Sequence, residues 1–188
     1  MPTPVRILAF SGSARLESLN RKFLAFAVQA LKDLGCGVTV ADLNDYVLPL
    51  YHGDLEDMSG VPENAKRLIA LIVSHQGLLV ASPEYNSMIT PLLKNTIDWC
   101  TREDDNPFTG KPAAVISASP GPLGGARSLI MAQALLLRVG CQIVPGQVFL
   151  PHASGAFDSG GRLTDERAQK SAKELMERLA REASRPPA

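Results

Sequence analysis

Short apolar runs alternate five times with longer segments of helical periodicity along this chain, and this alternation most constrains its fold. The runs show little in/out alternation, which is typical of strands that are buried on both faces of a parallel sheet. They cover residues 5–10, 37–43, 77–82, 112–119 and 142–150. The pattern predicts an open α/β sheet wound on both faces. Five strands suit the order 2-1-3-4-5 with right-handed crossovers.

The intervening segments carry apolar residues at spacings of three and four, as amphipathic helices do. We expect helices over 19–35, 63–77, 91–100, 124–140 and 164–182. Gly35 is placed to end the first helix, and Pro91 suits a first helical turn. Thr164 is expected as the N-cap of the last helix.

Length and composition indicate an ordinary globular chain. Its 188 residues predict a single domain over 1–188, with a frayed tail at about 184–188. Lys plus Arg and Asp plus Glu are equal at 19 each, which argues against a nucleic-acid-binding face. No apolar run reaches the roughly 18 residues of a membrane span, so we expect no membrane insertion.

The cysteines indicate a reducing compartment. Cys36, Cys100 and Cys141 are far apart, and neither a CxxC pair nor metal-ligand spacing is present. An odd number of cysteines without a cleavable signal predicts a cytoplasmic protein. We expect no metal site.

Ligands of such sheets bind outside the carboxyl ends of the strands, where the strand order reverses. The loop 11–20, SGSARLESLN, leads into a helix N-terminus, which favours an anion such as phosphate. Gly12 lets the backbone approach closely, and Arg15 adds positive charge. Side-chain donors are offered by Ser11, Ser13, Ser18 and Asn20. The alternative is an ordinary turn in which Ser18 only caps the helix.

A second loop at the same edge, 83–91, offers a border for a planar ring. Pro83 stiffens the turn, Tyr85 offers an aromatic face and a hydroxyl, and Asn86 offers an amide. Backbone N–H groups of 84–86 could meet the polar edge of the ring. The Ser/Pro/Gly loop 117–125 could pass its opposite end. Taken alone, the PEYN segment is also a plausible β-turn.

Together, SGSARLESLN and SPEYNSMITPLLKNTIDWCTR (82–102) resemble the NADPH-dependent FMN reductase family of flavodoxin-like proteins. That family includes quinone, chromate and azo-dye reductases. The likeness extends over nearly the whole chain, through GGAR (124–127) and GRLTDE (161–166). Family members often carry Gly directly after PEYN, whereas this chain has Ser87. This departure would alter the substrate side of the pocket more than FMN binding.

The resemblance implies a flavodoxin-like three-layer sandwich that binds FMN and uses NADPH or NADH as co-substrate. The residues that would hold the FMN phosphate are Ser11, Ser13, Arg15, Ser18, Leu19 and Asn20, the last two partly through backbone N–H groups. The residues that would border the isoalloxazine are Pro83, Glu84, Tyr85 and Asn86, with Ser119 and Gly121 at its other edge. Glu84 could equally form a salt bridge at a subunit contact. Family members imply a homodimer or homotetramer.

The resemblance also implies hydride transfer from NAD(P)H through FMN to a small acceptor such as a quinone, free flavin, azo compound or chromate. The flavin carries this chemistry, so no catalytic side chain is expected. His75 is expected to be a polar residue near a helix end, whereas Tyr51 and His52 lie in a loop that could reach the pocket. Two alternatives stay open: a flavodoxin-type electron carrier, and an FMN-binding sensor without substantial turnover.

Overall fold

The computed structural model describes residues 4–185 and contains one parallel sheet at its centre. The strand order is β2-β1-β3-β4-β5, so the predicted order 2-1-3-4-5 is confirmed. The last predicted strand is divided in two, and its second part, β6, pairs with β4. The strands are β1 (Arg6–Ser11), β2 (Gly37–Ala41), β3 (Gly77–Ala81), β4 (Pro112–Ala118), β5 (Gln142–Ile143) and β6 (Val148–Leu150).

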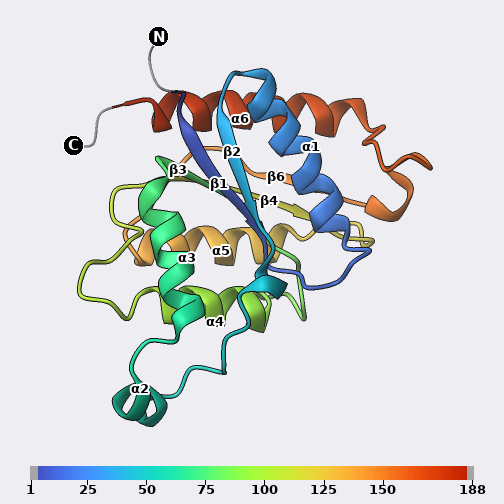
Figure 1. The fold of residues 1–188 in the computed structure, drawn as a ribbon. Coiled ribbons are helices and arrows are strands. Elements are labelled where there is room, and N and C mark those ends of the chain that lie inside the picture. The colour runs from blue at the N-terminus through green and yellow to red at the C-terminus, as the bar shows by residue number, and fades with distance from the viewer. Residues whose placement is uncertain (1–3, 186–188) are drawn as a thin grey trace.

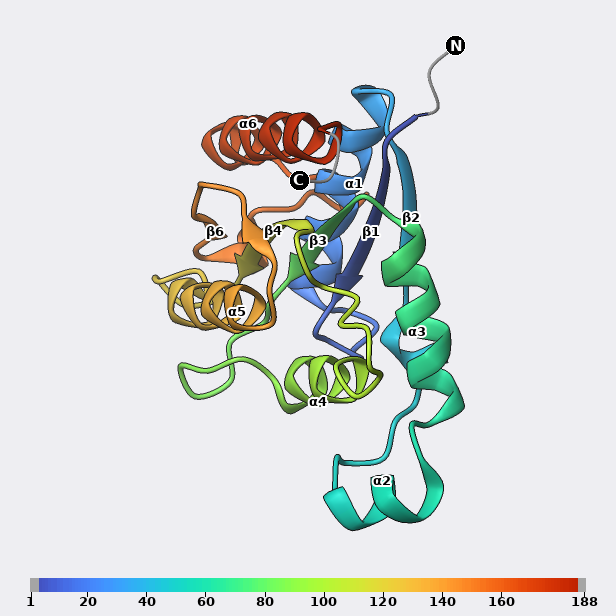
Figure 2. The ribbon, with the colours of Figure 1, turned by 90° about the vertical axis from the view of Figure 1, so that its left-hand side faces the viewer.

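Helices cover both faces of the sheet, which completes the three-layer sandwich (Figures 1 and 2). Helices α1 and α6 pack on one face, whereas α3, α4 and α5 pack on the other. These helices are α1 (Leu19–Asp33), α3 (Glu63–Ser74), α4 (Pro91–Cys100), α5 (Ala126–Arg138) and α6 (Glu166–Ala183).

The apolar composition of the strands follows from this double coverage. Along β1, Ile7 and Ala9 enter the core beneath α1 and α6, whereas Leu8 and Phe10 enter the core beneath α3 and α4. Successive side chains of a strand point to opposite faces, so a strand covered on both faces needs apolar residues at every position.

The predicted strand 142–150 is interrupted at Pro145 and Gly146. Proline has no N–H to donate to a ladder, and Gly146 has a φ of +144°. Before this break, β5 pairs with the start of β4; after it, β6 pairs with the carboxyl half of β4. One apolar run therefore supplies two short strands at the same side of β4.

The predicted N-cap of the last helix is wrong by one residue. The side chain of Asp165 accepts a hydrogen bond from the backbone N–H of Ala168, and α6 begins at Glu166. Thr164 instead donates its hydroxyl to the carbonyl of Ala156 at 3.0 Å. After α6, residues 184 and 185 are described, and the remainder of the expected tail lies outside the described residues.

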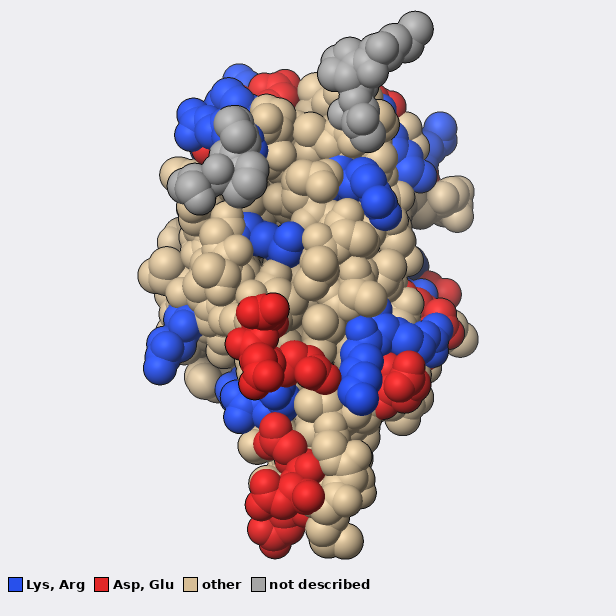
Figure 3. Space-filling model, turned by 60° about the vertical axis from the view of Figure 1, so that its left-hand side comes forward, with Lys and Arg blue, Asp and Glu red and all other residues tan. Residues whose placement is uncertain are grey.

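A short helix that the sequence did not indicate, α2 (Gly53–Ser59), lies in the loop after β2 and projects from the body (Figure 1). Its acidic residues belong to the acidic group at the narrow end of the molecule, whereas Lys and Arg are interspersed with acids elsewhere on that side (Figure 3). Within the described residues, no helix is both long and apolar enough to cross a membrane.

The same loop is attached to α4 through Trp99. The Trp99 side chain is fully buried, and its Nε1–H donates to the carbonyl of Pro49 at 2.8 Å. The ring of Tyr51 packs edge-on against Trp99, with centroids 5.1 Å apart. Tyr51 is thereby held near α4, and neither Tyr51 nor His52 lines the cavity described below.

Candidate functional site

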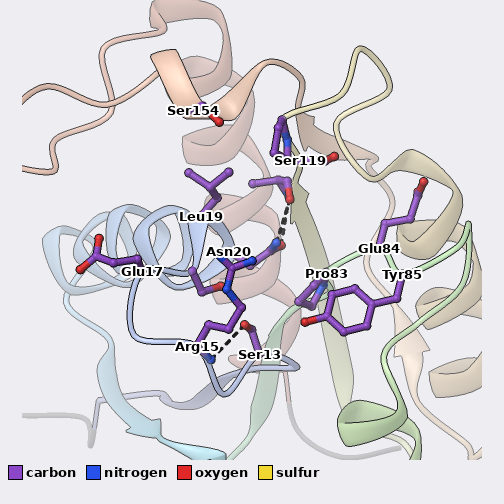
Figure 4. A pocket seen from close by; sticks show the side chains of 13 residues that line it. Ser13, Arg15, Glu17, Leu19, Asn20, Pro83, Glu84, Tyr85, Ser119 and Ser154 are labelled. Atoms are coloured by element: carbon purple, nitrogen blue, oxygen red, sulfur yellow. Dashed lines mark hydrogen bonds between the residues drawn. The ribbon is translucent and has the colours of Figure 1, made fainter.

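A cavity of about 350 Å³ opens at the carboxyl ends of β1, β3 and β4 (Figure 4). Its volume lies within the range of roughly 300–1,000 Å³ that is common for small-molecule sites. Nine of the twelve residues predicted for the site line it: Ser13, Arg15, Ser18, Leu19, Asn20, Pro83, Glu84, Tyr85 and Ser119. The structure therefore brings together three loops that are remote in sequence, at the edge where the sheet topology places a ligand.

One wall of the cavity is the N-terminus of α1. Ser18 caps this helix, because its Oγ accepts the backbone N–H of Arg21 at 3.4 Å. The first intrahelical bond runs from Lys22 N–H to the Ser18 carbonyl, so the N–H groups of Leu19 and Asn20 have no partner within α1. These free donors and the helix dipole favour an anion in the cavity.

The charged side chains at the N-terminus of α1 have a net positive charge. The Glu17 carboxylate pairs with Lys22 at 2.7 Å, and this hydrogen bond lowers the pKa of Glu17. Arg15 has no ion-pair partner among residues 4–185. A negatively charged ligand group at the α1 terminus would therefore find its counter-charge in Arg15.

Asn20 uses its side chain inside the protein. Its Nδ2–H donates to the carbonyl of Ala118 at 2.8 Å, and its Oδ1 accepts the N–H of the same residue at 3.0 Å. The side chain is buried, and Figure 4 shows it directed toward the end of β4. The oxygen and one of the two Nδ2 hydrogens of this amide are therefore used by Ala118, and the backbone N–H of Asn20 has no partner within α1.

Ser11 and Gly12 do not line the cavity. Ser11 lines a separate hollow between α1 and β2, and its buried Oγ has no hydrogen-bond partner among the described atoms. A Cβ at Gly12 would lie 2.9 Å from Cβ of Leu93 and 3.1 Å from Oγ1 of Thr90. Gly12 is therefore required for close packing against α4, not for the approach of a ligand.

The segment after β3 forms a tight hairpin turn. Tyr85 and Met88 exchange two backbone hydrogen bonds of 3.0 Å, with Asn86 and Ser87 between them at φ values of +51° and +67°. Two successive positive φ values are typical of a type I′ turn. The turn directs the half-exposed ring of Tyr85 over the cavity beside Pro83, while Asn86 does not line the cavity (Figure 4).

Glu84 caps the neighbouring helix. Its Oε2 accepts the backbone N–H groups of Arg127 and Ser128, both at 3.1 Å, at the start of α5. The guanidinium of Arg127 lies 3.9 Å from the same carboxylate and donates to the hydroxyl of Ser87 at 3.2 Å. The Glu84 side chain is only 15% exposed. The Glu84 carboxylate thus caps α5 within the same chain. The sequence had suggested two other roles for it, at the border of the isoalloxazine and in a salt bridge between subunits.

The loop after β6 contributes Ser154, which the sequence did not indicate as a site residue. The loop is held by bonds from Ala153 N–H to the carbonyl of Ser119 and from His152 N–H to the carbonyl of Gly121. Gly121 is occupied by these contacts and does not line the cavity. The topology could have indicated Ser154 as a lining residue, because every loop that follows a parallel strand reaches the same edge of the sheet.

The chemistry of the lining residues is that of binding. The cavity is lined by neither histidine nor cysteine, and no group of metal ligands occurs among the described residues. No hydroxyl in the lining is paired with a base. The arrangement can hold an anionic group at α1 and a flat polar group between Tyr85 and Ser119.

Known proteins similar to this chain belong to one family of oxidoreductases. The sequence profile of the family described as NADPH-dependent FMN reductase matches residues 5–155. An NAD(P)H-dependent FMN reductase of Pseudomonas aeruginosa is 34% identical over 180 residues, covering 95% of both chains. A quinone reductase of Pseudomonas putida is 35% identical over 158 residues, covering 82% of both.

A solved structure of a related oxidoreductase is similar to this chain in both fold and sequence. A flavoenzyme NAD(P)H:(acceptor) oxidoreductase from Paracoccus denitrificans superposes with a TM-score of 0.79 and 32% identity, covering 95% of this chain and 97% of the other. The family profile covers the three loops that form the cavity and includes Ser154. The chain therefore belongs to the NADPH-dependent FMN reductase family.

Proposed function

We propose that this protein is an FMN-dependent NAD(P)H oxidoreductase that reduces a small acceptor. The observation that carries the proposal is that one cavity is lined by the N-terminus of α1 and Arg15 as well as by Tyr85 and Ser119. An anion site and a site for a flat ring on one cavity fit a flavin mononucleotide, which has a phosphate at one end and a planar ring at the other.

The phosphate would lie at the N-terminus of α1. The hydroxyls of Ser13 and Ser18, the guanidinium of Arg15 and the N–H groups of Leu19 and Asn20 supply its donors. Each hydrogen bond to a charged group contributes about 1.5–3 kcal/mol. Several such bonds would hold the phosphate without the lysine of a P-loop.

The isoalloxazine would lie between the 83–86 segment and Ser119. The N–H of Tyr85 is used by the hairpin, whereas those of Glu84 and Asn86 have no partner within the described chain. The Glu84 N–H is thus available to the polar edge of the ring, whereas Asn86 lies outside the lining of the cavity. Glu84 supports this segment through its bond to α5, and Pro83 limits its flexibility.

When bound there, FMN would supply the redox chemistry between NAD(P)H and the acceptor. The residues that would hold the ring are Pro83, Glu84, Tyr85 and Ser119, and the half-exposed Tyr85 would leave the ring accessible to a substrate. Relatives described as quinone reductases favour a quinone as the acceptor, with free flavin, azo compounds and chromate as further candidates.

The alternatives are an electron carrier of the flavodoxin type and an FMN-binding sensor. A carrier that docks to proteins usually has a strong charge for steering, whereas this chain has a formal net charge of zero. The test is the visible spectrum of the purified protein during anaerobic NADPH addition, followed by a quinone. We expect bleaching of the flavin and reoxidation in repeated turnovers. A protein that fails to take up FMN would contradict the proposal, and bound FMN without NADPH oxidation would favour the alternatives.

We further propose a homodimer or homotetramer. Helix α5 exposes Ile130, Met131 and Leu137 on a face that no described element covers, and Leu123 is exposed just before it. Such clustered apolar surface is typical of subunit contacts. Light scattering at micromolar concentration should give at least twice the monomer mass, and a monomer would refute this.

All three cysteines are free, which supports a cytoplasmic location.

A further inference from the structure

The side chain of Asn20 joins two segments that are 98 residues apart in sequence. Its amide forms two hydrogen bonds with one residue, Ala118, and thereby pairs with the backbone as a neighbouring strand would. Only 4% of Asn20 is exposed. Buried polar groups are costly when unpaired, so this two-bond contact fixes the start of α1 against the end of β4.

Ala118 is the last residue of β4, and the cavity-lining Ser119 follows it directly. On the far side, Ser119 N–H donates to the carbonyl of Leu150 at 3.1 Å. The position of Ser119 is thus determined by β6 on one side and by Asn20 on the other. Because α1 and Ser119 both line the cavity, Asn20 fixes the position of Ser119 relative to the start of α1.

We propose that Asn20 is a positioning residue of the FMN site, acting through Ala118 and Ser119 on the end of the cavity that holds the ring. This inference rests on the proposed FMN site and differs from the phosphate role that the family motif implies for the Asn20 side chain. Both functional atoms of the amide are engaged by Ala118, and the side chain points toward the end of β4 (Figure 4).

The two roles predict different flavin specificities, because riboflavin has the ring of FMN but lacks its phosphate. Loss of a phosphate ligand lowers the affinity for FMN alone. Loss of a contact that positions Ser119 lowers the affinity for FMN and riboflavin by a similar factor. Loss of a purely structural contact lowers the unfolding midpoint and leaves both affinities unchanged.

The experiment titrates apoprotein with FMN and with riboflavin, following quenching of flavin fluorescence. We expect Asn20→Ala to weaken both by about 10-fold or more, whereas Ser13→Ala, the matched control on the phosphate side, weakens FMN and spares riboflavin. At saturating flavin and NADPH, Asn20→Ala should also slow flavin reduction. A loss confined to FMN, or unchanged affinity for both flavins, would overturn the proposal.

Two measurements keep the test decisive if Asn20→Ala does not fold or if no flavin binds. Asn20→Asp keeps the acceptor for Ala118 N–H and removes the donor to its carbonyl, so it retains half of the contact and undergoes the same titrations. Amide hydrogen exchange at Ala118 should be slow in both the unmodified chain and Asn20→Asp, even without flavin, because both keep the acceptor for this N–H; fast exchange at Ala118 in the unmodified chain would contradict the contact. Failure of the unmodified chain to bind either flavin would refute the FMN site alone.

Discussion

Glu84 Oε2 lies 3.1 Å from the backbone nitrogen of Ser128, and this contact joins the loop after β3 to the first turn of α5. The hydroxyl of Ser128 strengthens the connection, because it donates to the carbonyl of Pro83 at 2.7 Å. The loop proposed to border the flavin ring is therefore supported from behind by a helix terminus. A carboxylate at that position also interacts favourably with the helix dipole.

Removal of this cap should destabilise the protein. We expect Glu84→Ala to lower the free energy of unfolding of the apoprotein by about 1–2 kcal/mol, because two helix N–H groups lose their partner. Glu84→Gln retains an acceptor and should lose less. Urea unfolding followed by circular dichroism measures both. Glu17→Ala, which removes an exposed carboxylate beside the same cavity, should leave the midpoint nearly unchanged; an equal loss in that control would contradict the capping role.

The hairpin turn after Tyr85 offers a stabilising substitution. Ser87 has a φ of +67°, which glycine adopts without steric cost, so Ser87→Gly should raise the free energy of unfolding by about 0.5–1 kcal/mol. The hydrogen bond from Arg127 to the Ser87 hydroxyl is lost in both Ser87→Gly and Ser87→Ala. Ser87→Ala keeps the strain and is therefore the matched control. A glycine variant no more stable than the alanine variant would show that φ strain is unimportant here.

The overall fold was largely predictable from the sequence, because every residue of β3 and β4, and every residue of β1 after Arg6, is buried. The division of the last strand was missed, although Pro145 and Gly146 indicate it. Helix α2 was missed because none of its residues is buried, which leaves no apolar periodicity. Hydrophobic periodicity predicts a helix only where one face of that helix is buried.

The site was predictable as a set of loops but less so as individual roles. Parallel strands bring their following loops to one edge, so Ser13, Arg15, Tyr85 and Ser119 met as expected. The roles of Asn20 and Glu84 depend on the partners Ala118 and Ser128, which lie 98 and 44 residues away. The sequence lists polar groups, whereas only the packed structure shows which ones already have a partner within the protein.

Arg15 should contribute to FMN binding through its charge. We expect Arg15→Ala to weaken FMN about 10-fold and to spare riboflavin, and the effect should decrease at high salt because the side chain is exposed. Isothermal titration at low and high ionic strength measures this. Lys22→Ala removes one positive charge from the same helix terminus but from a residue paired with Glu17. If both variants lost FMN affinity equally, only net charge would matter.

The buried cysteines should be unreactive in the folded protein. Burial raises the pKa of the Cys100 and Cys141 thiols to about 12, so the reactive thiolate is scarce at pH 8. Burial also raises the pKa of Cys36, which is partly accessible. Titration with a thiol reagent should therefore label at most one cysteine per chain slowly, and three after denaturation. Rapid labelling of two or more in the native protein would contradict this packing.

His75 should make the stability depend on pH. Its ring is 1% exposed and lies within hydrogen-bonding distance of the hydroxyl of Thr39 and the carbonyl of Leu71, at 2.8 and 2.6 Å. Burial lowers the pKa of His75 below its ordinary value of 6.5, with the nearby charges of Arg6 and Lys111 acting in the same direction.

The unfolded chain therefore takes up a proton at His75 more readily than the folded one. The stability that His75 contributes is present above pH 6.5 and is lost as the pH falls below it toward the folded pKa, with a slope of up to about 1.4 kcal/mol per pH unit. Urea unfolding at pH 7.5, 6.5 and 5.5 should show this loss, and His75→Gln should reduce the slope. His52→Gln, at an exposed histidine, should retain it. An unaltered slope in His75→Gln would assign the pH dependence to other groups.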